Sequence, residues 1–302
     1  MYSFKLPVRK FIVSLKFIKK HYLPDFSGII LRSAFGVALK RVSCIFRGRD
    51  CKHCPLRDSC TWIYLFETPI EKNNRYLKGR NYAPHPFALT PLHSTDNSLV
   101  FELLLVGKGI NHLRWICAAF SILQDMGIGK RRVKFKIEDI KEYLPDGTKK
   151  SVLSDFDYDK KPFLLEDFVE YRLRNFNKDK LNVHCITPLR IKDRGKYTDQ
   201  ITFPVFYRAC QRRIRILSEF NGAKYRYIED IRDDIGAYLQ NSRWYELARY
   251  SVRQRTYMNM GGVVGDISYI GNFKEYLPAI FAGEFLCIGK NTSFGLGRFE
   301  VK

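Results

Sequence analysis

The chain has 302 residues, of which 45% are hydrophobic and 15% aromatic, so it can bury a substantial core and is not a disordered tail. Lys and Arg number 52 against 31 Asp and Glu, which gives a formal net charge of +21. An excess of this size favours a polyanionic partner, because clustered cations gain affinity by releasing the counterions of a phosphate backbone.

The first half of the chain predicts a strand, a helix, two strands, a helix and a strand, at residues 10–19, 25–42, 61–69, 98–107, 110–127 and 131–137. Leu31, Phe35 and Leu39 form the apolar stripe of the first helix. The stretch 61–69 is apolar on both faces, as a central strand is. This β-α-β-β-α-β order is the ferredoxin-like arrangement.

The same order returns beyond a polar, charged connection at residues 145–162, with predicted elements at residues 181–192, 203–220, 243–258, 261–271, 273–286 and 297–301. The sequence therefore predicts an α+β fold of two tandem ferredoxin-like (βαββαβ), RRM-like domains, at residues 1–148 and 149–302. No secretory signal opens the chain and no apolar run is long enough to span a membrane, so we expect a cytoplasmic protein.

A cysteine-rich insert at residues 43–61 interrupts the first predicted domain. Its cysteines follow the spacing C-x6-C-x2-C-x5-C, at Cys44, Cys51, Cys54 and Cys60. Four thiolates close a tetrahedral zinc site, and a structural zinc would hold a loop that is too polar to bury a core. An iron–sulfur cluster is the alternative. The other cysteines stand on apolar faces and are predicted core residues: Cys117, Cys185, Cys210 and Cys287.

The last glycine-rich loop, "GKNTSFGLGR" at residues 289–298, is a candidate phosphate-binding site. It supplies sharp bends, two cations and a hydroxyl, at Gly295, Gly297, Lys290, Arg298 and Ser293. A Walker loop is excluded, because five residues separate Gly283 from Gly289 and Asn291 stands at the Ser/Thr position. Amides and cations suit a nucleic-acid backbone, and an ordinary helix-to-strand turn is the alternative.

The spacing of Gly289, Gly295 and Gly297 near the end of a tandem ferredoxin-like chain resembles that of the RAMP superfamily. With "RYSVRQRTYMNMGGVVGDISY", "ITPLRIK" and "LRSAFGVALKRVSC", the chain is similar to CRISPR precursor-RNA-processing endoribonucleases over nearly its whole length. The resemblance implies cleavage of repeat RNA without a catalytic cofactor, by attack of a ribose 2′-OH that leaves a 2′,3′-cyclic phosphate and a 5′-hydroxyl.

The partners that the resemblance implies are CRISPR repeat RNA, as precursor crRNA, and a CRISPR effector complex, with no membrane. A non-catalytic RAMP subunit that only holds guide RNA is the alternative function. We predict contacts to the RNA backbone from basic positions of one strand and one helix, at Arg249, Arg253, Arg255, Arg208, Arg212 and Arg215.

The general base is not fixed by any motif of this chain. His21 precedes the first predicted helix, His53 follows it, and Lys40 lies near its end. We expect one of the histidines to carry the proton transfer, since imidazole titrates near neutral pH. His53 also lies between two predicted metal ligands, and His112 opens the second predicted helix, where it is equally able to cap or pack.

Overall fold

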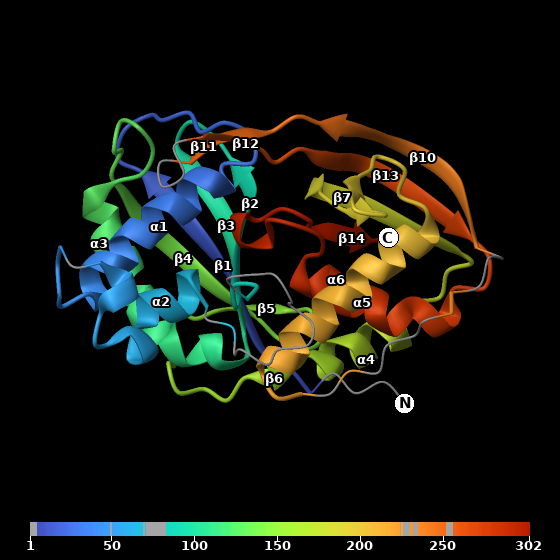
Figure 1. Ribbon diagram of the computed structural model, residues 1–302, viewed down its shortest axis with the longest axis horizontal. Coiled ribbons are helices and arrows are strands. Elements are labelled where there is room, and N and C mark those ends of the chain that lie inside the picture. Colours follow the sequence, from blue (N-terminus) through green and yellow to red (C-terminus); the bar gives the residue numbers. More distant parts are fainter. Residues whose placement is uncertain are drawn as a thin grey trace. The chain divides into compact units, whose positions relative to one another are not determined.

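The computed structural model describes residues 5–48, 50–68, 70, 83–223, 225, 230–231, 235–251 and 256–302 (Figure 1). The chain divides into two compact units, Leu6–Leu144 with Thr148–Phe163, and Leu164–Lys302 with Pro145–Gly147. The first unit thus extends past the predicted boundary at 148–149. The reason is that β5 pairs with β4 and that the ring of Phe156 stacks on Phe11, with centroids 5.5 Å apart.

The N-terminal unit is built on an antiparallel sheet of order β2-β3-β1-β4-β5. Its strands are β1 (Pro7–Phe17), β2 (Phe87–Ser94), β3 (Ser98–Val106), β4 (Phe135–Tyr143) and β5 (Lys149–Ser151). Its helices are α1 (Gly28–Ser43), α2 (Thr61–Phe66) and α3 (Leu113–Met126), the last preceded by the 3₁₀ helix η3 (Gly107–His112). Phe35 of α1 stacks on Phe120 of α3, and both belong to the core over β1 and β3.

The stretch 61–69 was predicted as a central strand, and this prediction is wrong for residues 61–66, which form α2. Helical geometry brings Trp62 and Phe66 together one turn apart, and their rings stack with an interplanar angle of 2°. The pair packs on α1 at Gly36, whose carbonyl oxygen accepts a hydrogen bond from the Trp62 indole (3.0 Å). The second strand is instead β2, which lies between the predicted elements 61–69 and 98–107.

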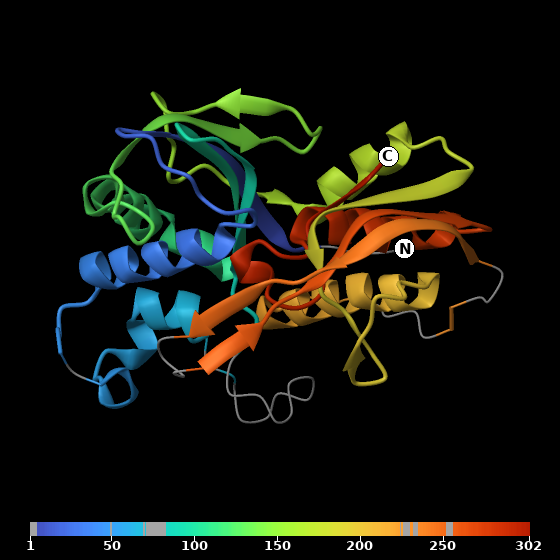
Figure 2. The same cartoon turned by 90° about the horizontal axis from the view of Figure 1, so that it is seen from above.

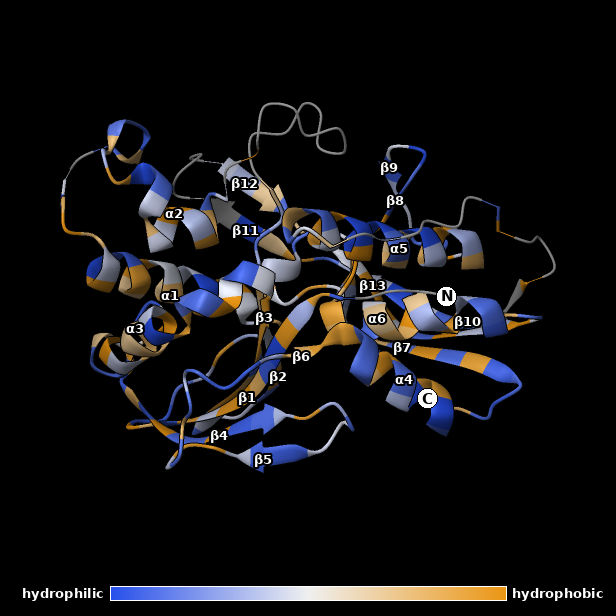
Figure 3. Ribbon diagram, turned by 90° about the horizontal axis from the view of Figure 1, so that it is seen from below, coloured by the Kyte–Doolittle hydropathy of each residue, from blue (hydrophilic) through white to orange (hydrophobic). Residues whose placement is uncertain are grey.

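The C-terminal unit has an antiparallel sheet of order β10-β13-β7-β14. Its strands are β7 (Lys180–Leu189), β10 (Gly236–Tyr245), β13 (Gly262–Ile270) and β14 (Phe299–Val301), and its helices are α4 (Leu165–Asn175), α5 (Phe203–Phe220) and α6 (Leu277–Leu286). In Figure 3, α5 alternates hydrophilic and hydrophobic bands, as expected for a helix with one buried face. Phe206 of α5 contacts Tyr269 and Phe299 of the sheet, which places the core between them.

Short elements connect these layers. The two-residue strand β6 (Phe163–Leu164) lies at the boundary of the units, and η4 (Lys274–Tyr276) leads into α6. Two hairpins lie outside the main sheet of the C-terminal unit, β8 (Lys192–Asp193) with β9 (Lys196–Tyr197) and β11 (Ala248–Ser251) with β12 (Thr256–Asn259). Figure 2 shows β11 and β12 as a ribbon that extends from β10 and β13. No helix in the described part of the chain combines the length and apolar character that a membrane span requires.

Candidate functional site

The glycine-rich loop at residues 289–298 has a backbone that side chains rarely adopt. Gly289, Gly295 and Gly297 have φ angles of 86°, 79° and 78°, and Asn291 has a φ of 64°. A Cβ at Gly297 would collide with the carbonyl oxygen of Ile288. Glycine is therefore required here both by the left-handed conformation and by the close approach of a second backbone segment.

Hydrogen bonds fasten this loop to the end of β7. The Gly297 amide donates to the Pro188 oxygen (3.1 Å), and the Lys290 amide donates to the Arg190 oxygen (2.9 Å). The Thr187 hydroxyl donates to the Gly295 oxygen (2.8 Å) and accepts from the backbone N–H of Arg298 (2.9 Å). The "ITPLRIK" segment thus forms the support of the loop, which explains why the two stretches belong to one site.

Two of the predicted phosphate ligands in this loop are buried. Ser293 and Arg298 are 5% and 7% exposed. The guanidinium of Arg298 donates to the backbone oxygen of Phe299 and lies 3.2 Å from the Glu300 carboxylate. In the structure these contacts hold Arg298 inside the C-terminal unit, where it orders the start of β14. Lys290, by contrast, lines a pocket.

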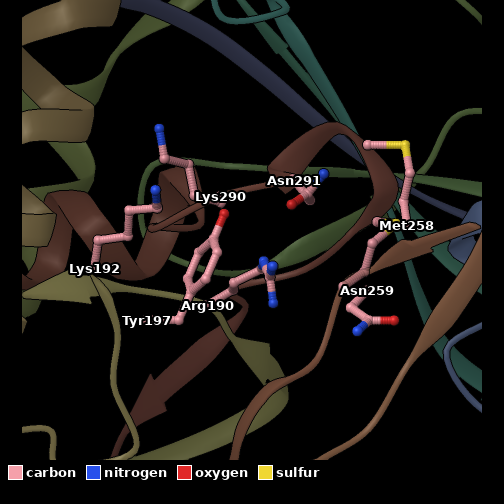
Figure 4. A pocket seen from close by; sticks show the side chains of 8 residues that line it. Arg190, Lys192, Tyr197, Met258, Asn259, Lys290 and Asn291 are labelled. Atoms are coloured by element: carbon pink, nitrogen blue, oxygen red, sulfur yellow. The ribbon is translucent and has the colours of Figure 1, made fainter. Parts of the chain in front are cut away.

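This pocket has a volume of about 420 Å³ and is bounded by the glycine-rich loop, the end of β7, the β8–β9 hairpin and β12 (Figure 4). Arg190, Lys192 and Lys290 contribute three cations, and no Asp or Glu is found among its described lining residues. Tyr197 lies beside two of these cations, with its ring centroid 3.5 Å from Arg190 Cζ and 4.8 Å from Lys192 Nζ. The pocket therefore has the charge of an anion-binding site.

Sequence reasoning missed Arg190 as a site residue, although it lies in the quoted "ITPLRIK" stretch. Its side chain is 7% exposed and donates from one terminal nitrogen to the Gly261 oxygen (2.6 Å). Its Nε has no hydrogen-bond acceptor within the described residues. The available signal was an arginine near the end of the predicted strand 181–192, but only the tertiary structure places it under the loop.

The predicted RNA-binding arginines fall in different environments. Arg208 and Arg212 are exposed on α5. Arg249 packs on the Phe294 ring at 4.6 Å, and burial lowers the pKa of its guanidinium. Arg253 and Arg255 lie outside the described residues.

Arg215 and Arg213 complete the basic positions of α5. Arg215 is half-buried. Arg213 is buried, and burial lowers the pKa of its guanidinium to about 10. Since Arg213 faces inward, the solvent-exposed charge of this helix comes from Arg208 and Arg212.

Among the candidates for proton transfer, His53 and Lys40 are not brought together. The His53 side chain is 85% exposed and its Nδ1 lies 3.3 Å from the Asp50 carboxylate. Lys40 Nζ lies 4.9 Å from the Trp62 ring. His53 therefore lies in a solvated turn, and Lys40 covers an aromatic ring of α2.

His112, which opens the second predicted helix, has a packed environment. Its Nδ1 lies 3.1 Å from the Thr61 hydroxyl, and its ring stacks on Tyr64 with centroids 4.8 Å apart. Burial lowers the pKa of the imidazole. These contacts connect η3 to α2, so His112 packs between these elements, in agreement with the packing alternative rather than the capping one.

His21 has the environment most suited to a general base. Its ring meets Phe17 edge-on at 5.5 Å, and its Nε2 faces the turn at Gly129, where an added Cβ would lie 2.8 Å away. Its Nε2 is shielded from solvent and has no hydrogen-bond partner in the described structure. Burial and the charge of Arg131 lower the pKa of the imidazole, so the neutral, proton-accepting form is favoured.

The four predicted metal ligands are free, partly exposed thiols. Cys44 ends α1, Cys51 and Cys54 lie in and after η1 (Cys51–His53), and Cys60 lies between η2 (Arg57–Ser59) and α2. Within the described ranges, no three His, Cys, Asp or Glu side chains converge in the geometry of a metal site. As placed, the thiols do not form a closed ligand set, and the zinc site stays a prediction.

Comparisons with known proteins identify the family. Residues 183–299 match the model of the CRISPR-associated endoribonuclease Cas6, and residues 6–162 match AF_1859_N, described as an N-terminal domain. No curated protein matches the sequence.

Solved structures confirm the tandem ferredoxin-like α+β fold. Cas6 of Thermus thermophilus has a TM-score of 0.54 and 14% identity, covering 98% of this chain and 99% of that one. A Cas6 product complex has a TM-score of 0.57 at 13% identity, with coverage of 98% and 99%. A partial Cas6–RT–Cas1–Cas2 complex has a TM-score of 0.58 at 13% identity, and the match covers 98% of this chain and 46% of that one. The chain thus contains a domain of the CRISPR-associated endoribonuclease Cas6 at residues 183–299, and it belongs to the family of the AF_1859_N model, which covers more than half of it at residues 6–162.

Proposed function

We propose that this endoribonuclease matures CRISPR RNA by cutting repeat RNA without a catalytic metal, through attack of a ribose 2′-OH on the adjacent phosphate. The observation that carries the proposal is the cationic pocket on the glycine-rich loop of the Cas6 domain, which suits an RNA backbone. The exposed Arg208 and Arg212 of α5 add sequence-independent affinity for phosphates. The similarity to a Cas6 product complex is consistent with this substrate.

In the proposed step, His21 accepts the proton of the 2′-OH as the oxygen bonds to phosphorus. The bond from phosphorus to the 5′ oxygen breaks, and that oxygen takes up a proton from solvent water, which leaves a 2′,3′-cyclic phosphate and a 5′-hydroxyl. Lys130 and Arg131 are exposed on the turn that faces His21 and can neutralise the charge that develops on the phosphorane. Because burial and Arg131 lower its pKa, His21 is neutral at pH 7 and ready to accept a proton.

This mechanism predicts cleavage in EDTA and no cleavage of a substrate with a single 2′-deoxy residue at the cut site. The deoxy RNA should bind with unchanged affinity, since it keeps every phosphate and base. A single-turnover assay on both RNAs, with the melting curve of the same sample as a control for folding, makes the comparison. Cleavage of the deoxy RNA would exclude the 2′-OH mechanism. Binding of both RNAs without cleavage of either would favour the non-catalytic RAMP subunit.

A structure of similar fold bears on the association of this chain with other CRISPR proteins. A Cas6-like chain that this chain resembles in fold belongs to a partial Cas6–RT–Cas1–Cas2 complex. We therefore propose that this chain also associates with other CRISPR proteins in a complex.

We also propose that Cys44, Cys51, Cys54 and Cys60 hold a structural zinc, with an iron–sulfur cluster as the alternative. Three of these cysteines surround a single turn. The Arg57 guanidinium donates to the Cys51 oxygen (3.2 Å), the Arg57 amide donates to the Cys54 oxygen (3.0 Å), and the Cys60 amide donates to the Arg57 oxygen (3.4 Å). The thiols would still have to converge, and the metal would supply only folding energy.

We expect colourless purified protein with one equivalent of zinc per chain, measured by elemental analysis. Replacement of Cys54 by Ser should abolish the zinc and lower the melting temperature, because the insert loses its cross-link. The matched control is Cys117→Ser, a change outside the insert at a half-buried position, which should keep the zinc. A brown protein that contains iron would support the alternative, and metal-free, fully folded protein would exclude both.

A further inference from the structure

The pocket beside the glycine-rich loop contains a buried cation, Arg190, whose hydrogen-bonding capacity is only partly used by the described residues. Arg190 is 7% exposed, and its Nε finds no acceptor among the described residues. The described residues that line the pocket bring no carboxylate to Arg190. A buried charge without a counter-charge is costly, so this arrangement indicates an anion that binds from outside.

The remaining lining of the pocket is suited to a nucleobase. Tyr197 keeps 42% of its surface exposed while Arg190 lies against its ring at 3.5 Å. Met258 adds an apolar surface, and Asn259 and Asn291 add amide groups on the other side, as Figure 4 shows. Aromatic and thioether groups contact a base face, and amides hydrogen-bond to its edge.

The size of the pocket limits the ligand. A volume of about 420 Å³ is at the lower end of the range for small-molecule sites, which is roughly 300–1,000 Å³. The phosphate-facing cations, Arg190, Lys192 and Lys290, come from the end of β7, the β8–β9 hairpin and the glycine-rich loop. One small cavity thus combines cations, which suit a phosphate, with apolar and amide groups, which suit a base.

We infer that this pocket receives a single nucleotide of the RNA, turned out of the stack, and sets the base preference at one position of the repeat. The inference rests on the proposed function, because the nucleotide belongs to the RNA that the enzyme processes. It assigns sequence discrimination to the β8–β9 hairpin and β12, while the loop backbone supports the phosphate. Single-stranded RNA is commonly read in this way, by stacking and by contacts to exposed base edges.

The test measures the Kd of the full-length protein for a set of repeat RNAs, each with one base replaced. The variants are Asn259→Ala and Tyr197→Leu, both at exposed positions, so the fold should persist. With wild-type protein, replacement of one particular base should weaken binding by about tenfold or more, as expected for a stacked and hydrogen-bonded base. In both variants this penalty should vanish at that position and remain unchanged at the others.

Lys192→Ala should weaken binding of all the RNAs about equally and reduce the salt dependence of log Kd by about one. The matched control is Lys196→Ala, which removes an exposed cation of the same hairpin whose side chain does not line the pocket. It should leave the preference at the selected position intact.

Several outcomes would overturn the inference. If the variants bind and cleave repeat RNA with the base preferences of the wild type, the inference is overturned and the proposed function stands. Tight binding of a free mononucleotide, with unchanged RNA discrimination in the variants, would assign the pocket to a small ligand instead. Wild-type protein that neither binds nor cleaves repeat RNA would overturn the proposed function, and the inference with it.

Discussion

Replacement of His21 by Ala is expected to lower the single-turnover rate of repeat cleavage by about 10²- to 10⁴-fold, the usual contribution of a general base. The affinity for RNA should stay the same, because the change removes no phosphate contact. In wild-type protein the rate should rise with pH and then level off. The midpoint of the rise should lie below about 6.5, which is the ordinary imidazole pKa. The sign follows from the lowered pKa of His21, since the active form is the neutral one.

The controls are His93→Ala and His53→Ala, whose side chains are exposed. Both should cleave at nearly the wild-type rate. A melting curve separates catalysis from folding, because the His21 ring packs on Phe17, and His21→Gln keeps a polar side chain of similar reach. A normal rate in both His21 variants would require a different base, and a large loss in His53→Ala would point to the cysteine insert.

Replacement of Gly297 by Ala is expected to destabilise the C-terminal unit by at least about 3 kcal/mol, near the upper end for a single substitution. The left-handed backbone, with a φ of 78°, costs a side chain about 1–2 kcal/mol by itself. The added methyl would also collide with the Ile288 oxygen. No side-chain movement can relieve this collision, because that oxygen belongs to the backbone. Thermal unfolding should show a midpoint lower by at least about 6 °C, together with weaker RNA binding.

Gly222→Ala provides the matched control. Gly222 has a φ of 71°, but no atom of the described residues lies within 4 Å of the position that its Cβ would take. This variant should lose only about 1–2 kcal/mol from conformational strain. Equal melting temperatures for the two variants would show that the collision at Ile288 is relieved and that the loop is not held rigidly.

In the C-terminal unit, α5, α6 and most strands could be predicted from the sequence, whereas α4 lies in a stretch for which no element was predicted. The stretch 203–220, which has one apolar face, corresponds to α5, the mainly apolar stretch 273–286 corresponds to α6, and 181–192 corresponds to β7. The stretch 61–69 could not be assigned, because a short apolar run suits a buried strand and a buried helix equally. Only the packing of Trp62 on α1 decides the outcome.

The glycine-rich loop could be located from its spacing, but the direction of its side chains could not. Arg298 is buried because its guanidinium meets Phe299 and Glu300, a consequence of tertiary contacts. Arg190 joins the loop only because β7 ends beneath it. Likewise, His21 and the turn at Gly129 are far apart in sequence and become neighbours through the fold.

The fastening of residues 289–298 to the end of β7 has a consequence for recognition. A receptor segment with so many backbone tethers gives up little freedom when it captures its ligand, so the entropic penalty of docking falls almost wholly on the polynucleotide. Repeats that are already kinked, or that bend readily, would then be captured preferentially over stiff ones. Selection among transcripts would thus depend on the pliability of the RNA as well as on its nucleotide sequence.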